Sequence, residues 1–115
     1  MSISYEGMGQ WAATFACGEV SVGQVVKPAA ENSVAACADG DAFAGVVLAR
    51  ARSGDACTVV LGGTAEVSYS GSSAPAVGWQ KLCADGNGGV KTDAGGREQL
   101  VLSVDEAAKR CVIVL

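Results

Sequence analysis

An all-β fold, a small sandwich or barrel, is predicted by three features of this 115-residue sequence. Short apolar stretches alternate with turn signals at intervals of about ten residues. Glycine occurs 16 times, spread along the whole chain, whereas proline occurs only twice. Several apolar stretches alternate with polar residues at period two, which is the side-chain repeat of a strand. The length is that of one domain.

The expected strands lie between Gly- and Asp-containing breaks such as Asp39-Gly40-Asp41 and residues 53–55, 85–89 and 93–96. Glycine reaches positive φ at low cost, and Asp or Asn caps a turn with its own side chain, so these breaks have a physical basis. Only residues 104–109 have a helical pattern, of one or two turns. We expect strands over residues 24–29, 33–37, 44–52, 56–62, 64–70, 80–83, 99–104 and 110–115.

The alternation also predicts which side chains point inward. In the strand at 56–62, Cys57, Val59 and Leu61 share one face. In the strand at 99–104, the inward set is Leu100, Leu102 and Val104. The last strand is apolar on both faces, which favours a closed core or a neighbouring subunit.

Residues 1–16 differ from the rest of the chain, because they hold three of the six aromatic residues and a single charge. One interpretation is an ordinary first strand. The other is an extended arm, residues 1–16, that lies on another protein and uses Tyr5, Trp11 and Phe15 as anchors. Large aromatic side chains are the usual energetic centres of interfaces, and extended segments add readily to sheet edges. In that interpretation residues 17–115 form a single β-barrel domain.

The composition argues against catalysis, nucleic-acid binding and membrane insertion. There is no histidine, so a His base, a His ligand and a His-dependent triad are excluded. A net charge of −4 with scattered basic residues does not suit phosphate binding. The longest apolar run, 42–49, is far shorter than the ~20 residues that span a bilayer. We expect a soluble protein made in the cytosol, without catalytic residues, metal or cofactor.

Two groups of residues, the cysteines and a set of Asp and Asn side chains, are of types that bind metals or react, but we interpret both groups as structural. The five cysteines lack zinc-site spacing, and we expect buried free thiols; an intersubunit disulfide or an adventitious metal site is the alternative. Asp85, Asn87 and Asp93 offer oxygen ligands for calcium, but their spacing does not fit the known calcium loop. We therefore expect them to cap turns.

Three stretches resemble the small decoration, or cement, proteins that stabilise tailed-bacteriophage capsids. They are VGQVV at 22–26, DGDAFAGVV at 39–47 and GDACTVVLGG at 54–63, followed by Val77-Gly78-Trp79 and a short apolar last strand. The resemblance covers residues 18–115. It implies a compact β-barrel or β-tulip domain with an N-terminal arm that runs along the major capsid protein.

The resemblance also implies a function. Such proteins are commonly homotrimers on three-fold and quasi-three-fold positions of the capsid exterior, after synthesis in the bacterial cytoplasm. A ligand that binds the assembled shell and not the free subunit stabilises the shell by mass action. The alternative is a small β-barrel binding module for carbohydrate or a host surface, with Trp79 as its platform. A third interpretation is an accessory subunit or small-ligand enzyme domain.

Overall fold

The computed structural model describes residues 10–71 and 73–115 and contains strands and turns without helix in these ranges. The all-β prediction is therefore confirmed, and so is the barrel. The strands are β1 (Gln10–Cys17), β2 (Val25–Ala30), β3 (Ser33–Ala36), β4 (Gly45–Arg50), β5 (Ala56–Ser68), β6 (Gly78–Ala84), β7 (Val90–Thr92), β8 (Arg97–Asp105) and β9 (Arg110–Val114).

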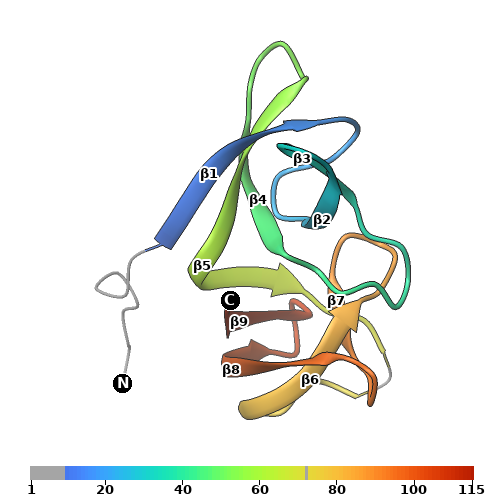
Figure 1. The fold of residues 1–115 in the computed structure, drawn as a ribbon. Coiled ribbons are helices and arrows are strands. Elements are labelled where there is room, and N and C mark those ends of the chain that lie inside the picture. The colour runs from blue at the N-terminus through green and yellow to red at the C-terminus, as the bar shows by residue number, and fades with distance from the viewer. Residues whose placement is uncertain (1–9, 72) are drawn as a thin grey trace.

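Five strands close a barrel, in the order β1, β3, β2, β4 and β5, with β5 pairing back to β1 (Figure 1). The pairing of β1 with β3 is parallel, and the others are antiparallel. A closed ring leaves no free edge within these strands, which removes a common route to aggregation. The inside is filled by small apolar side chains, among them Val26, Val47, Val59 and the thiols of Cys17 and Cys57.

β5 is one strand that belongs to two sheets. Its first part lies in the barrel, and residues 64–68 pair with β9, which continues through β8 to β6 and β7. The chain bends between the two parts at Gly62-Gly63, where Gly63 has a φ of +89° (Figure 1). The sequence predicts two separate strands here, 56–62 and 64–70. Positive φ at a glycine explains the difference, because it bends the strand without ending its pairing.

A second core lies between the barrel and the outer sheet. It includes Phe43 and Val46 from the barrel side and Leu82, Val101 and Ile113 from the sheet. The β6–β7 hairpin ties the two parts together by backbone hydrogen bonds, since the Val25 N–H donates to the Gly88 carbonyl at 2.9 Å. The described chain is thus one continuous packed unit.

Two predictions of which side chains point inward are wrong, and so is one prediction of secondary structure. On β8, Gln99 and Val101 are buried and Val104 packs against the second core as predicted, whereas Leu100 and Leu102 are half-buried. A bulge between Val101 and Ser103 shifts the register, so a regular repeat across it fails. Leu61 is exposed because it adjoins the bend of β5.

Residues 106–109 form a turn and not a helix. The Ala108 N–H donates to an Asp105 carboxylate oxygen at 3.1 Å, and Lys109 has a left-handed φ of 54°. A left-handed residue cannot continue a right-handed helix, so the chain reverses into β9.

The N-terminal segment is a barrel strand from Gln10 onward. Residues 10–16 pair with β5 from Gly63 to Ala56, and the end of β1 also pairs with β3. The alternative of an ordinary first strand therefore describes residues 10–17. The expected arm is restricted to the residues before Gln10, which lie outside the described ranges.

Candidate interaction surface

The structure places Trp11 and Phe15, two of the three aromatic residues that the sequence offers as anchors, in different environments. Trp11 is 78% exposed on β1, and its ring lies against Gly62, where an added Cβ would be 2.5 Å from a ring carbon. One face of the ring covers the β5 backbone and the other meets solvent. Phe15 is half-buried and packs against the barrel core. Tyr5 lies outside the described residues. Of the two that the structure describes, Trp11 has the exposure that an interface anchor needs.

A second exposed tryptophan, Trp79, lies near the start of β6 and is 67% exposed. Its neighbour two positions earlier, Val77, is also exposed. Across the sheet, Trp79 pairs with Leu100, which pairs with Val114, which pairs with Thr64. Directly paired residues share a face, so these four side chains form one row across β6, β8, β9 and β5. We call it the Trp79 row.

The Trp79 row ends beside the start of β1. The side-chain amide of Gln10 donates to the Thr64 carbonyl at 2.7 Å, and Gln10 precedes Trp11. In Figure 1, β1 begins at the left of the molecule and β6 begins at its bottom.

The edge of β6 next to Trp79 is open. β6 pairs with β8 over residues 78–82 but with β7 only over residues 82–84. On the side away from β8, residues 78–81 have no strand partner within the part of the chain that the structure describes. The Lys81 carbonyl points to that side, because it accepts the Asp93 N–H at 3.1 Å. Backbone groups alternate along an antiparallel strand, so the Trp79 N–H and carbonyl also point outward.

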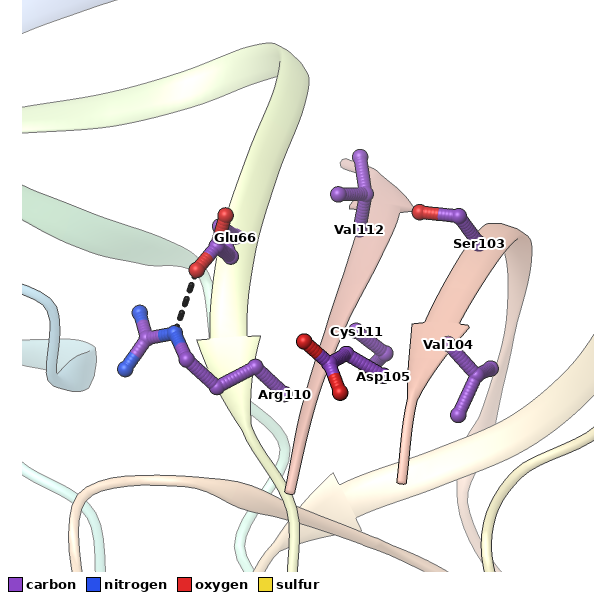
Figure 2. A pocket seen from close by; sticks show the side chains of 7 residues that line it. All are labelled: Glu66, Ser103, Val104, Asp105, Arg110, Cys111 and Val112. Carbon is purple, nitrogen blue, oxygen red and sulfur yellow. Dashed lines mark hydrogen bonds and ion pairs between the residues drawn. The ribbon is translucent and has the colours of Figure 1, made fainter. Parts of the chain in front are cut away.

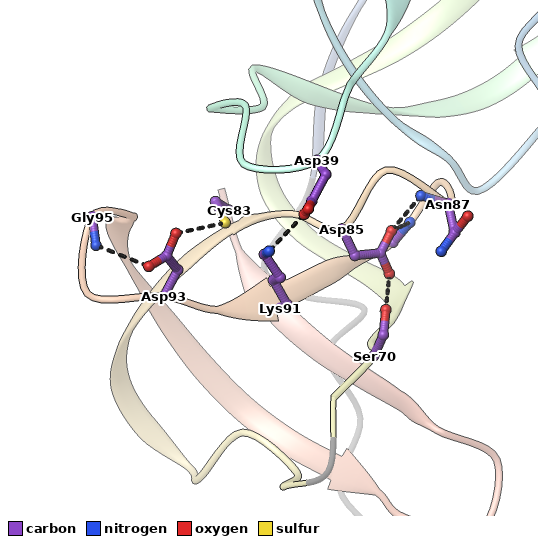
Figure 3. A network of polar contacts seen from close by, with 9 residues as sticks. Asp39, Ser70, Cys83, Asp85, Asn87, Lys91, Asp93 and Gly95 are labelled. Carbon is purple, nitrogen blue, oxygen red and sulfur yellow. Dashed lines mark hydrogen bonds and ion pairs between the residues drawn. The ribbon is translucent and has the colours of Figure 1, made fainter.

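A network of turns capped by Asp side chains holds the β6–β7 hairpin in place (Figure 3). One Asp85 oxygen accepts the N–H groups of Asn87 at 2.7 Å and Gly89 at 3.1 Å, and the other accepts the Ser70 hydroxyl. An Asp93 oxygen accepts the Gly95 N–H at 3.3 Å. The prediction that Asp85 and Asp93 cap turns is confirmed, whereas Asn87 takes part through its backbone N–H and not through its side chain. Within residues 10–71 and 73–115, no three His, Cys, Asp or Glu side chains converge in a way that would hold a metal ion.

The hollows of the surface are small. The one in Figure 2 has a volume of about 130 Å³ and lies between β5, β8 and β9, next to the Arg110–Glu66 ion pair. A shallow polar hollow of about 270 Å³ lies beside the open edge of β6 and includes Gln80, Lys81 and Asp93. Small-molecule sites are usually 300–1,000 Å³ and largely enclosed. These two hollows are therefore poor sites for a small organic substrate.

All five cysteines are free and buried, as predicted. Burial is the main cause that raises the pKa of Cys37, Cys57 and Cys111 from 9.0 to about 11. Burial also raises the pKa of Cys83. The thiolate is the reactive form, so a raised pKa makes these four thiols poor nucleophiles at neutral pH.

The open edge was not predicted from the sequence, although Trp79 itself was singled out. The signal available was the alternation of Val77, Trp79 and Lys81, because a lysine on an otherwise apolar strand face is typical of an edge strand. No helix in the described ranges is long and apolar enough to cross a membrane. Comparison with protein-family models and with curated proteins finds no match to this chain.

Proposed function

We propose that this chain is a structural virion protein that binds the outside of a tailed-phage capsid, as a homotrimer at three-fold positions, and stabilises the shell. The observation that carries the proposal is the open β6 edge with Trp79 beside it, on a compact barrel that presents a second exposed tryptophan. Exposed edges and exposed aromatics are the features by which one protein surface binds another. The resemblance of residues 18–115 to capsid decoration proteins supports the same function.

In this proposal the two tryptophans have different partners. Trp11, the second residue of β1, contacts the major capsid protein. Trp79 and the open edge contact the neighbouring subunit of the trimer. The chain performs no catalysis and needs no cofactor, because its task is to add contacts to an assembled lattice. Many copies on one shell make modest individual contacts effective.

The test measures two quantities on matched variants, W11A and W79A, each of which removes one exposed tryptophan. Co-sedimentation with expanded capsids of the encoding phage reports binding, and light scattering reports the mass of the free protein. We expect wild type to bind saturably. W11A should bind at least tenfold more weakly with unchanged mass, because interface tryptophans contribute about 2 kcal/mol or more. W79A should lower the mass to that of a monomer. No binding of the wild-type chain to capsids would overturn the proposal.

The exposure of Trp79 also favours the second candidate function, a binding module for carbohydrate or a host surface, since an exposed aromatic ring can stack on a sugar. A glycan array separates the two functions. Specific glycan binding by wild type that is lost in W79A, with an unchanged mass of the free protein, would support this candidate over the first.

A further inference from the structure

The sequence contains two asparagines, and both are exposed in turns between strands. Asn32 lies between β2 and β3 and precedes Ser33, whereas Asn87 lies between β6 and β7 and precedes Gly88. An asparagine is chemically labile, because the backbone nitrogen of the next residue can attack its side-chain carbonyl carbon. The surroundings of that nitrogen therefore decide which of the two asparagines reacts.

The Asn87–Gly88 peptide leaves both reacting groups accessible. The side-chain amide of Asn87 makes no hydrogen bond with the described residues and lies on the outside of the polar network (Figure 3). The Asp85 carboxylate accepts the N–H groups of Asn87 and Gly89, but the Gly88 N–H between them donates no hydrogen bond within residues 10–71 and 73–115. Glycine has no side chain that could shield its nitrogen.

The Asn32–Ser33 peptide is instead held within the sheet. Ser33 is the first residue of β3 and pairs with Ala30 of β2 and Ala16 of β1. The Asn32 carbonyl accepts the Ala16 N–H at 2.9 Å. The serine side chain also hinders approach to the Ser33 nitrogen. Asn32 is therefore an internal control for Asn87.

We propose that Asn87 is a site of spontaneous modification, at which water converts the asparagine to isoaspartate and aspartate. The Gly88 nitrogen gives up its proton and attacks Asn87 Cγ, and the new C–N bond closes a succinimide ring. The side-chain nitrogen takes up a proton and leaves as ammonia. Water then opens the ring, at the side-chain carbonyl to give aspartate or at the main-chain carbonyl to give isoaspartate. The reaction consumes one water, releases one ammonia and needs no oxidant.

Isoaspartate would disturb the contact between the hairpin and the barrel. It routes the main chain through the former side chain, which adds one carbon atom between residues 87 and 88. Gly88 has no room to move toward the barrel, because even a Cβ there would be 2.9 Å from Gln24 Cγ. Its carbonyl accepts the Val25 N–H at 2.9 Å, and the longer main chain displaces that carbonyl. The new carboxylate also repels the Asp85 carboxylate nearby. The modification therefore loosens the β6–β7 hairpin.

The test follows both asparagines in the unmutated, folded chain during a long incubation in mildly alkaline buffer. Peptide mapping by mass spectrometry measures the amide that remains at each asparagine, and electron-transfer fragmentation separates isoaspartate from aspartate. We expect Asn87 to convert several-fold faster than Asn32, with isoaspartate among the products. The melting temperature of the incubated protein should fall by several degrees, because a hydrogen bond that ties the hairpin to the barrel is lost.

Asn87→Gln separates this loss from other ageing. The longer side chain closes a ring far more slowly, and residue 87 contributes only its backbone N–H to the network, so the variant should fold like wild type. After incubation it should retain its melting temperature, whereas the matched control Asn32→Gln should lose as much as wild type.

Two results would overturn the proposal. One is an Asn87 that stays intact in the folded chain while it converts in the chain unfolded by urea, since the fold would then protect it. The other is an equal fall in melting temperature for incubated wild type and Asn87→Gln, since the loss would then have another origin.

Discussion

Gly96 lies directly against the peptide backbone of Leu82, such that a Cβ at residue 96 would be 2.6 Å from the Leu82 carbonyl oxygen. Leu82 is the residue at which β6 changes from pairing with β8 to pairing with β7, and residues 93–96 connect those two strands. The absence of a side chain at Gly96 lets this connection pass close to β6. The position of the β6–β7 hairpin, and with it the open edge at Trp79, depends on this contact.

Gly96→Ala should therefore destabilise the fold by about 3 kcal/mol, because the obstacle is backbone that cannot rotate away. Urea unfolding measures the loss. Gly95→Ala is the matched control, since a Cβ at residue 95 would meet no atom within 4 Å and its stability should be close to wild type. Equal stabilities of the two variants would contradict the close approach.

Asp85→Ala should cost about 1–3 kcal/mol, because it leaves the N–H groups of Asn87 and Gly89 without their acceptor and frees the Ser70 hydroxyl. Asp105→Ala, which removes one cap on the exposed β8–β9 turn, should cost less. Thermal unfolding of both variants compares them. A larger loss for Asp105→Ala would show that the Asp85 turn does not brace the hairpin.

Arg50→Lys should destabilise the barrel by about 1–2 kcal/mol. The guanidinium group donates to the carbonyls of Val20 at 2.6 Å, Gly18 at 3.1 Å and Gly54, and so joins two loops. A lysine ammonium lacks the planar fork that reaches several acceptors at once. The exposed neighbour Arg52 offers the control, and Arg52→Lys should leave the urea midpoint unchanged. An unchanged urea midpoint for Arg50→Lys would mean that the hydrogen bonds of the guanidinium group add nothing to the stability of the fold.

Stability should fall as pH rises above about 9. The thiols of Cys37, Cys57 and Cys111 have a pKa of about 11 in the folded protein, against 9.0 ordinarily. Between these values the unfolded chain releases protons that the folded protein retains, so the unfolded state binds fewer protons and becomes favoured. The stabilising contribution is complete below pH 9 and is lost by about pH 11.

Urea unfolding at several pH values between about 8.5 and 10, below the usual range of lysine, measures the slope. Cys111→Ala should start less stable, because it leaves a small cavity, but should lose stability with pH less steeply than wild type. Equal slopes in the two proteins would contradict the assigned pKa of Cys111.

Local signals in the sequence predicted most of the strands but not how they meet. Turns such as Asp39-Gly40-Asp41 carry their own conformational preference, and they separate the strands where expected. The three-residue strand β7 lies in a glycine-rich stretch with no alternation to reveal it. The bulge in β8, which reverses the expected facing of Leu100, depends on its partner strand.

The candidate interaction surface, like the strand pairing, could be predicted from the sequence only in part. Trp11 and Trp79 are visible in the sequence as rare large aromatics, but their exposure follows from the fold. Phe15 has the same apolar character as Trp11, and its position on β1 turns it toward the barrel core. The open edge of β6 exists because β7 stops short, which is a property of strand pairing over the whole sheet.

The most direct test of the proposed function is the protein composition of purified virions made from the genome that encodes this chain. Quantitative mass spectrometry should find the chain in the particles at about three copies for each occupied three-fold position, and high salt or mild heat should release it before the capsid protein. Particles that contain the major capsid protein but lack this chain would contradict a role as a capsid decoration protein.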